Sequence, residues 1–517
     1  MKDSVLLHEL VSHNAEMRPD ALALTNQSAH LTYGELANSI KRFASGAIAL
    51  GLARGERVAV YLEKRFENVI ACFGASAAGC IFVPINPLLK PEQVAYILRD
   101  CNVRLLVTSQ DRLALLSEVL PDCQDLSHVL CVDAQPQWDE FLNQPLVALP
   151  RRIDSDPVGI FYTSGSTGKP KGVVLSHRNM VAGAKSVAGY LENSRDDVLL
   201  AALPLSFDAG FSQLTTGFFV GARVVLLNYL LPRDVIKTIA RERVTGLTAV
   251  PPLYIQLTQI PWPESITDHL RYFANTGGRM PRETLTALRK HLPRTQPFLM
   301  YGLTEAFRST YLPPEEVDNR PDSIGKAIPN AEILVLRADG SSCAPNEPGE
   351  LVHRGALVSL GYWNNPPATA ERFKQLPPTM PSLVLPEIAV FSGDTVRMDE
   401  AGFLYFIGRN DEMIKTSGYR VSPTEVEEIL YATQMVGECV AFGVNNERLG
   451  QSIQVIATAP GNADLDTAAL LAECRSRMPA YMVPAGIAVQ NGPLPRNPNG
   501  KIDRKLLSTV WLEQNTA

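Results

Sequence analysis

The sequence contains no pattern of cysteine and histidine that is typical of a metal site or a disulfide framework. Its eight cysteines include no CxxC pair, and its eight histidines show no ligand spacing. We therefore expect reduced, mostly buried thiols, as in a cytosolic protein, and no metal site built from side chains alone. No Ser/His/Asp or Cys/His constellation is visible either, which argues against catalysis through a side-chain nucleophile.

An excess of positive charge is also missing. The formal net charge of −6 and the pI near 5.9 argue against nucleic acid as a partner. Residues 1–20 lack the long apolar core and the cleavage site of a signal peptide, so we expect a cytoplasmic protein. The apolar stretch 198–231 is interrupted by Asp208, Gln213 and Arg223. It therefore predicts a buried strand, helix and strand, and no membrane span.

The most informative segment is YTSGSTGKPKG, at residues 162–172. Apolar runs at 158–161 and 173–175 predict a strand on each side of a loop. Glycines let backbone N–H groups turn toward an anion, and hydroxyls and lysines add donors. The spacing is not that of a P-loop, because two residues rather than four separate Gly165 from Gly168. A short Gly/Ser segment alone would more often be a flexible surface loop, whereas the full string predicts a phosphate cradle.

Strand-like and helix-like patterns alternate through about the first four hundred residues. Examples are the strands at 57–61, 81–84, 105–108 and 129–132 and the apolar helix at 66–78. This alternation predicts an α/β fold with largely buried sheets.

The character changes near residue 408. After a strand at 404–407 comes a polar turn, and then a helix whose start combines Ser422 as N-cap, Pro423 at the first position and Glu425 at the third. Strands at 439–444 and 453–458 and a helix at about 465–478 follow. We therefore place a domain boundary at about 408–411.

The segment 162–172 resembles the phosphate loop of the AMP-forming adenylating superfamily, which contains acyl-CoA synthetases, carrier-protein adenylation domains and luciferases. Further motifs that resemble this superfamily occur in order up to the last twenty residues or so, and the tail 495–505 resembles carrier-protein adenylation domains. The whole chain is most similar to exosortase-associated AMP-forming acyl-CoA ligases and to stand-alone amino-acid adenylation enzymes.

The resemblance implies a large N-terminal domain of stacked α/β sheets with a β-barrel-like subdomain, followed by a small mobile α+β domain. The expected limits are 1–408 for the AMP-binding domain, 409–411 for the hinge and 412–517 for the C-terminal domain. We expect a monomer or a homodimer.

The resemblance also implies how ATP is held. Tyr301 would stack on adenine, and Asp394 would accept both ribose hydroxyls, as an ionised carboxylate can. Glu305 would hold Mg²⁺ against the phosphates. Taken alone, the pentapeptide 301–305 would be better explained as a strand-end turn with a surface glutamate. The full implied ATP set is Thr163, Ser164, Gly165, Ser166, Thr167, Gly168, Lys169, Lys171, Thr276, Gly277, Gly278, Tyr301, Gly302, Thr304, Asp394 and Arg409.

Four implied sites fall in or beside the second domain. Lys501 would be the catalytic lysine of adenylation, where a cation between the attacking carboxylate and the α-phosphate stabilises the transition state. Lys415 belongs to a segment expected at the active site during thiol transfer, Gly418 to the pantetheine tunnel and Asp411 to the hinge. The alternatives are a solvated tail lysine for Lys501 and a hairpin turn for 415–420.

The implied acid pocket contains two charged residues. Asp208 falls where amino-acid-activating domains keep the carboxylate that binds the substrate ammonium, although it could instead cap a helix. If Arg308 points inward, it could bind a second carboxylate and select an aspartate-like diacid. Alternatively, the two pair with each other, because a buried carboxylate needs a cationic partner. The implied pocket residues are Phe207, Asp208, Ser212, Leu253, Ala274, Met300, Arg308 and Ser309.

The predicted function is ATP- and Mg²⁺-dependent adenylation of an acid, with release of pyrophosphate, followed by transfer to a phosphopantetheine thiol. An amino acid loaded onto a separate carrier protein is the first hypothesis, because of Asp208. An acyl-CoA synthetase that uses free CoA and a short or functionalised acid is the second. A catalytically silent binding protein is the third, and the intact Lys169, Glu305, Asp394 and Lys501 argue against it.

Overall fold

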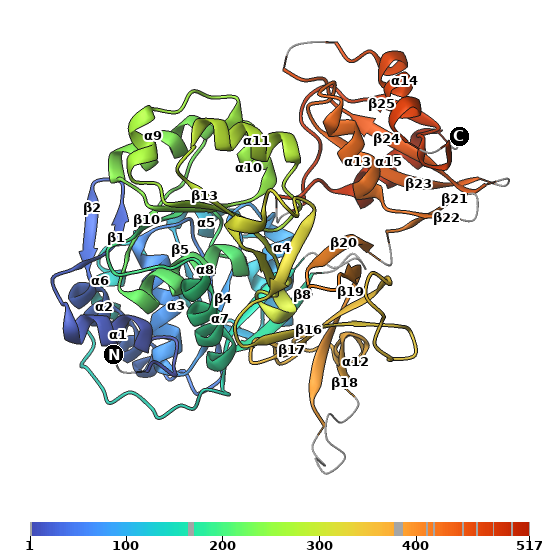
Figure 1. The fold of residues 1–517 in the computed structure, drawn as a ribbon. Coiled ribbons are helices and arrows are strands. Elements are labelled where there is room, and N and C mark those ends of the chain that lie inside the picture. Colours follow the sequence, from blue (N-terminus) through green and yellow to red (C-terminus); the bar gives the residue numbers. More distant parts are fainter. Residues whose placement is uncertain are drawn as a thin grey trace.

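The computed structural model describes the chain except residues 1–2, 164–169, 377–385, 410–411, 417–418, 447–448, 462–463, 479, 498–499 and 516–517. At 415, 419 and 420 it describes the backbone alone. Three sheets organise the described residues, two in a large N-terminal part and one in a small C-terminal part (Figure 1). The predicted α/β fold with a large first domain and a small second domain is confirmed.

The first sheet has six strands and is parallel except at one edge. In spatial order the strands are β6 (His128–Cys131), β5 (Val103–Thr108), β3 (Arg57–Tyr61), β4 (Ile81–Pro84), β7 (Pro157–Thr163) and β8 (Lys171–Ser176). Only β7 and β8 pair antiparallel. The predicted strands at 57–61 and 81–84 have the observed bounds, because short apolar runs between polar turns define them locally.

The second sheet is long, and its first half is parallel. This half contains β13 (Gln296–Tyr301), β12 (Tyr272–Asn275), β11 (Gly246–Ala249), β9 (Val198–Ala201), β10 (Arg223–Leu226) and β1 (Leu22–Asn26), with β2 (Ala29–Thr32) antiparallel at the edge. The stretch 198–231 forms β9, a helix and β10, as its interrupted apolar pattern predicted. Within the described ranges, no helix combines the length and apolarity that crossing a membrane requires.

The other half of the long sheet is antiparallel. It contains β14 (Thr310–Leu312), β15 (Ser323–Ala327), β20 (Leu404–Arg409), β19 (Ile388–Met398), β17 (Gly349–Gly355) and β16 (Ala331–Leu336), with β18 (Phe373–Gln375) paired to β19. These strands occupy the place of the predicted barrel-like subdomain, and they are ordered as a continuation of the long sheet.

Helices cover both faces of the two sheets. The helices are α1 (Glu9–Met17), α2 (Tyr33–Ala49), α3 (Phe66–Ala78), α4 (Pro91–Asp100), α5 (Gln110–Leu115), α6 (Gln137–Leu142), α7 (His177–Tyr190), α8 (Asp208–Val220), α9 (Pro232–Glu242), α10 (Pro251–Thr258), α11 (Arg282–His291) and α12 (Pro366–Arg372). Phe211 of α8 stacks on Phe82 of the six-stranded sheet, with ring centres 4.9 Å apart. Gly217 of the same helix faces Val224 of the long sheet. Helix α8 therefore lies between the sheets, inside the main core.

The small domain has its own sheet and core. Its strands are β22 (Tyr419–Val421), β21 (Ile414–Thr416), β24 (Gly450–Ala457), β23 (Cys439–Asn446) and β25 (Gly486–Val489), and its helices are α13 (Pro423–Ala432), α14 (Thr467–Arg477) and α15 (Arg504–Asn515). Ser422 is the N-cap residue of α13 as predicted, but its side chain makes no capping bond. Because β20 belongs to the long sheet and β21 to the small one, a boundary at 409–411 is compatible with this topology and stays a prediction.

Candidate active site

The predicted phosphate loop joins two neighbouring strands of the six-stranded sheet. β7 and β8 bring Thr163 opposite Lys171 at the base of the loop, and Thr163 Oγ1 donates to the Lys171 carbonyl at 3.4 Å. The strand–loop–strand frame is therefore confirmed. Six predicted phosphate contacts, namely Ser164, Gly165, Ser166, Thr167, Gly168 and Lys169, lie outside the described residues and stay predictions.

Helix α4 braces the residues on both sides of this loop. The Tyr162 hydroxyl donates to the Asp100 carboxylate at the end of α4. The Tyr96 hydroxyl of the same helix donates to the Pro170 carbonyl at 3.2 Å. Burial, followed by the nearby Cys101 and Asp100, raises the pKa of Tyr162 well above its ordinary value, so this hydroxyl stays a donor. The entry and exit of the loop are thus fixed to one helix.

Tyr362, which the sequence analysis did not single out, links this region to the predicted Mg²⁺ ligand. Its hydroxyl donates to Glu305 Oε1 at 2.5 Å, and the Lys171 ammonium lies 5.4 Å from the centre of its ring. Tyr362 is placed there because it pairs antiparallel with Val173 of β8. Since 57 residues separate Glu305 from Tyr362, no local sequence signal could have joined them.

The surroundings of Glu305 fit a magnesium ligand. One carboxylate oxygen accepts the Tyr362 hydrogen bond, and a carboxylate keeps further lone pairs for a hard cation. In the part of the chain that the structure describes, no group of three or more His, Cys, Asp or Glu side chains could hold a metal ion. A Mg²⁺ ion at Glu305 would therefore take its other ligands from phosphate and water, and it would neutralise phosphate charge.

A second cluster lies where three strands of the long sheet end or bend. It consists of Tyr301, Asp394 and Arg409. The Tyr301 hydroxyl donates to Asp394 Oδ2 at 2.5 Å, and Arg409 Nε lies 3.2 Å from Asp394 Oδ1. Burial raises the pKa of Asp394, whereas Arg409 opposes that shift. Asp394 Oδ1 is buried without a hydrogen-bond partner among the described residues. An oxygen that accepts no hydrogen bond suits a ribose hydroxyl. The ribose contact that the resemblance implies for Asp394 stays a prediction.

Lys501 of the small domain lies beside the loop 276–278. A Cβ atom added to Gly277, whose φ is +75°, would lie 3.9 Å from Lys501 Cε. Burial and the Arg409 guanidinium lower the pKa of Lys501, while Asp394 and Asp208 oppose that shift. Residue 501 nevertheless keeps solvent exposure. The Lys501 side chain therefore lies beside the loop 276–278, and the charges of both carboxylates act on its ammonium.

An interdomain ion pair explains how the small domain is held in this position. Arg279, which follows the loop 276–278, contacts Asp322 at 2.6 Å and also contacts Glu428 of α13. Burial raises the pKa of Glu428 to about 7, although Arg279 acts in the opposite direction. Lys501 and α13 are thus docked on the same short segment. Asp411 and Gly418 lie outside the described residues, and the Lys415 side chain is not described, so their roles stay predictions.

Asp208 and Arg308 form a nearly buried ion pair. Arg308 Nη1 donates to Asp208 Oδ2 at 3.0 Å, and Thr304 Oγ1 donates to Asp208 Oδ1 at 3.2 Å. The Arg308 side chain is 3% exposed and that of Asp208 is 15% exposed. Arg308 therefore points inward, and the two residues pair. The N-cap explanation of Asp208 is wrong, because Phe207 holds the cap position of α8 and Asp208 is its first residue.

A strained turn aims Arg308 inward. Phe307 has φ +59° and ψ −56°, and the Arg308 N–H donates to the Ala306 carbonyl at 2.6 Å, which closes a γ-turn. The Phe307 ring is fully buried and lies so close to Gly183 of α7 that a Cβ atom there would approach it to 2.4 Å. Strained residues of this kind persist where packing over-determines them. The turn thus orients the guanidinium toward α8.

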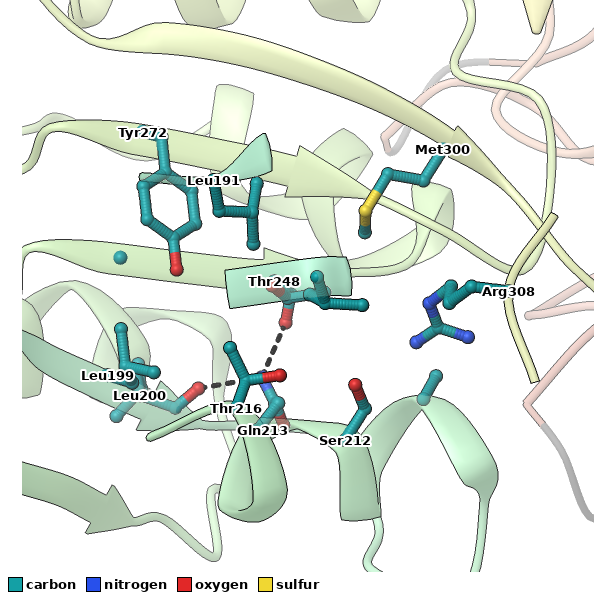
Figure 2. A pocket seen from close by; sticks show the side chains of 13 residues that line it. Leu191, Leu199, Leu200, Ser212, Gln213, Thr216, Thr248, Tyr272, Met300 and Arg308 are labelled. Atoms are coloured by element: carbon teal, nitrogen blue, oxygen red, sulfur yellow. Dashed lines mark hydrogen bonds between the residues drawn. The ribbon is translucent and has the colours of Figure 1, made fainter. Parts of the chain in front are cut away.

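A cavity of about 20 Å³ extends from Arg308 along α8 (Figure 2). Of the predicted pocket residues, Ser212, Met300 and Arg308 line it, whereas Phe207, Asp208, Leu253, Ala274 and Ser309 do not. Leu253 packs in the core on the other face of the long sheet, and the Ser309 hydroxyl bonds His353 Nδ1 at 3.0 Å. The remaining lining residues have no motif that marks them as pocket residues in the sequence. They are Val187, Leu191, Leu199, Leu200, Ala209, Gln213, Thr216, Gly246, Thr248 and Tyr272.

Lys64 supports the loop that leads into α8. Its ammonium donates to the carbonyls of Ala202 and Leu203 at 2.8 and 3.3 Å. The residue is 8% exposed, and burial lowers its pKa from 10.5 to about 7. The described residues include no acidic side chain in an ion pair with it. Folding therefore favours the neutral amine, and it releases a proton between pH 7 and the ordinary pKa of lysine.

This linkage predicts a specific pH dependence of stability. Because the unfolded chain binds more protons at this site, the free energy of unfolding should rise from pH 7 to 9, by up to about 1.4 kcal/mol per pH unit. The Lys64→Met variant should lack this contribution. Urea unfolding at pH 7, 8 and 9 measures it, with Lys237→Met, an exposed lysine of α9, as control. Identical pH slopes for wild type and Lys64→Met would contradict the prediction.

Family comparisons match both parts of the chain. Residues 11–363 match the AMP-binding enzyme family, and residues 425–501 match the AMP-binding enzyme C-terminal domain. The matched regions include Glu305 in the first and Lys501 in the second.

Individual relatives fall into two groups. A linear gramicidin synthase of Brevibacillus parabrevis is 30% identical over 97% of the chain, but the chain spans only 6% of its length. The long-chain-fatty-acid–CoA ligase of Salmonella typhimurium is 28% identical, over 97% of the chain and 94% of its own length. Among solved structures, an anthranilate CoA ligase with bound anthranoyl-AMP superposes with a TM-score of 0.89 at 25% identity, covering 99% of this chain and 98% of that one. The o-succinylbenzoate CoA synthetase of Bacillus subtilis gives 0.84 at 27% identity, with coverages of 96% and 97%.

Proposed function

The chain belongs to the AMP-binding enzyme family, and on that premise we propose which acid and which thiol this AMP-forming acid–thiol ligase uses. The acid is a small amino acid, with an aspartate-like amino dicarboxylic acid as the first candidate. The acceptor is the phosphopantetheine thiol of a separate carrier protein. The small domain, from about 412 onward, moves about a hinge at 409–411 between the two half-reactions.

The predicted ATP and metal contacts and Lys501 have roles in the first half-reaction. Asp394 holds the ribose, Tyr301 lies against the adenine, and the loop 163–171 holds the phosphates, with Mg²⁺ on Glu305 to neutralise their charge. Thr304 contacts the α-phosphate. The Lys501 ammonium stabilises the negative charge that develops as the acid attacks the α-phosphorus. No side-chain nucleophile is needed, because positioning and charge neutralisation account for catalysis.

The observation that carries the choice of acid is the Asp208–Arg308 ion pair, 3.0 Å long and nearly buried. An amino dicarboxylic acid offers an ammonium to Asp208 and a second carboxylate to Arg308. Each member of the pair then exchanges one ionic partner for another, and neither is left buried and uncompensated. Thr304, which also bonds Asp208, places this exchange next to the reacting phosphate.

The same pair also supports a second candidate. If Asp208 and Arg308 remain paired when the substrate binds, Asp208 needs no substrate ammonium. The acid is then a short or functionalised one without an amino group. Free CoA is then the acceptor. The similarity to CoA ligases along their whole length favours this alternative, whereas the similarity to the linear gramicidin synthase favours the first.

Acid-dependent exchange of pyrophosphate into ATP separates the two candidates. We expect exchange with aspartate or a related amino acid, and weaker exchange with succinate, butanoate and benzoate. Exchange only with acids that lack an amino group would reject the amino-acid proposal and favour CoA. Absence of exchange with every acid would reject adenylation itself. Formation of AMP with carrier protein or with CoA then identifies the acceptor.

A further inference from the structure

The cavity beside Arg308 is a narrow slot along one face of α8. Ala209, Ser212, Gln213 and Thr216 line it, spaced as one side of a helix. Its volume of about 20 Å³ leaves room for little more than one group of the size of water. A long or branched acyl chain does not fit such a slot, whereas a short side chain with a small end group does.

Two polar atoms of the slot have no partner. Thr216 Oγ1 and Arg308 Nε are buried and make no hydrogen bond within the described chain, and each residue is 2% exposed. Figure 2 shows the Thr216 and Ser212 side chains and the Arg308 guanidinium facing a common space below Met300. Unpaired buried polar atoms are uncommon and costly, so these two indicate a ligand that pairs with them.

The side chain of Gln213, which also lines the slot, already forms hydrogen bonds with the backbone of the protein. Gln213 Nε2 donates to the Leu200 carbonyl at 2.8 Å and to the Thr248 carbonyl at 3.0 Å (Figure 2). These bonds hold the wall of the slot rigid and use both amide hydrogens. Gln213 is therefore not available to a ligand, whereas the unpaired atoms of Thr216 and Arg308 are.

We infer that the slot takes the polar end of a short substrate side chain, and that Thr216 is a specificity-determining residue that hydrogen-bonds it. This inference rests on the proposed function and adds to it that the side chain ends in a hydroxyl, amide or carboxylate rather than in a methyl group. An apolar end group would leave both Thr216 Oγ1 and Arg308 Nε unpaired in the bound state, which is how sites of this kind reject it.

The test compares acids of nearly equal size that differ in the end group. Pyrophosphate exchange is measured for threonine against valine, asparagine against leucine, and 3-hydroxybutanoate against 3-methylbutanoate. We expect wild type to favour the polar member of the pairs it accepts by tenfold or more in kcat/KM. Thr216→Val, which replaces the hydroxyl by a methyl group, should lower that ratio about tenfold, and Thr216→Ser should keep it.

Thr215→Val is the matched control. Thr215 is fully buried in the same helix, but its hydroxyl donates to the Ser212 carbonyl at 3.3 Å and it does not line the slot. Its ratio should equal that of wild type. Preference for apolar acids, or an unchanged ratio in folded Thr216→Val, would overturn the inference. If Thr216→Val fails to fold, the kcat/KM ratios of wild type and of Thr216→Ala test the inference instead. Absence of exchange with aspartate and with all six acids would reject the proposed function, and the inference with it.

Discussion

Replacement of Lys501 by alanine is expected to lower acid-dependent pyrophosphate exchange by about a hundred- to thousandfold, the usual effect of removing one group that stabilises developing charge. The position of Lys501 explains the size of this expected loss. Lys501 Cε lies beside Gly277, and the charges of Asp394, Asp208 and Arg409 all act on its ammonium. The rate of exchange at saturating ATP and acid is the measurement.

Two controls make this result specific. Lys505→Ala removes an exposed lysine from the start of α15, four residues away, and should leave exchange unchanged. Transfer to the thiol from a synthetic acyl-adenylate should survive in Lys501→Ala, because the proposal gives this lysine to the first half-reaction alone. Equal losses in both half-reactions would show that Lys501 acts on the fold of the small domain, and full exchange activity would refute its catalytic role.

Replacement of Arg308 by alanine is expected to abolish any preference for amino diacids over amino monoacids. The variant leaves Asp208 with Thr304 as its hydrogen-bond partner and without its ion-pair partner. Breaking a buried ion pair from one side typically costs about 3–5 kcal/mol. Because the Asp208 side chain is 15% exposed, we expect the lower end, roughly 3 kcal/mol. The ratio of kcat/KM for aspartate and alanine, together with urea unfolding, tests both parts.

The double variant Arg308→Ala with Asp208→Ala separates selectivity from stability. It removes both charges, so it should recover much of the stability while it remains unselective. Arg178→Ala breaks an exposed ion pair with Asp154, whose N–O distance is 2.8 Å, and should cost under about 1 kcal/mol. Unchanged selectivity in Arg308→Ala would refute the diacid proposal, and unchanged stability would refute the energetic importance of the pair.

Much of the fold followed from local sequence signals. The strands at 57–61 and 81–84 and the helix at 66–78 have the predicted bounds, because apolar runs and polar turns define such elements without reference to the rest of the chain. The strand–loop–strand frame of 162–172 was likewise predictable from its glycines and flanking apolar residues. The predicted position of the α13 N-cap is confirmed, because Ser422 is the N-cap residue. The capping hydrogen bond expected of its side chain is not formed.

The amino-acid sequence by itself determined the α/β class, the two-part organisation and the cluster of motifs for a nucleotide and a cation. Tertiary structure alone decided which side chains meet. Tyr362 reaches Glu305 through its pairing with β8, Arg308 pairs with Asp208 from across a strained γ-turn, and Thr216 enters the slot because α8 lies between two sheets. The physical reason is that propensity and periodicity act over a few residues, whereas these contacts depend on strand register and helix packing across 50 to 100 residues of chain.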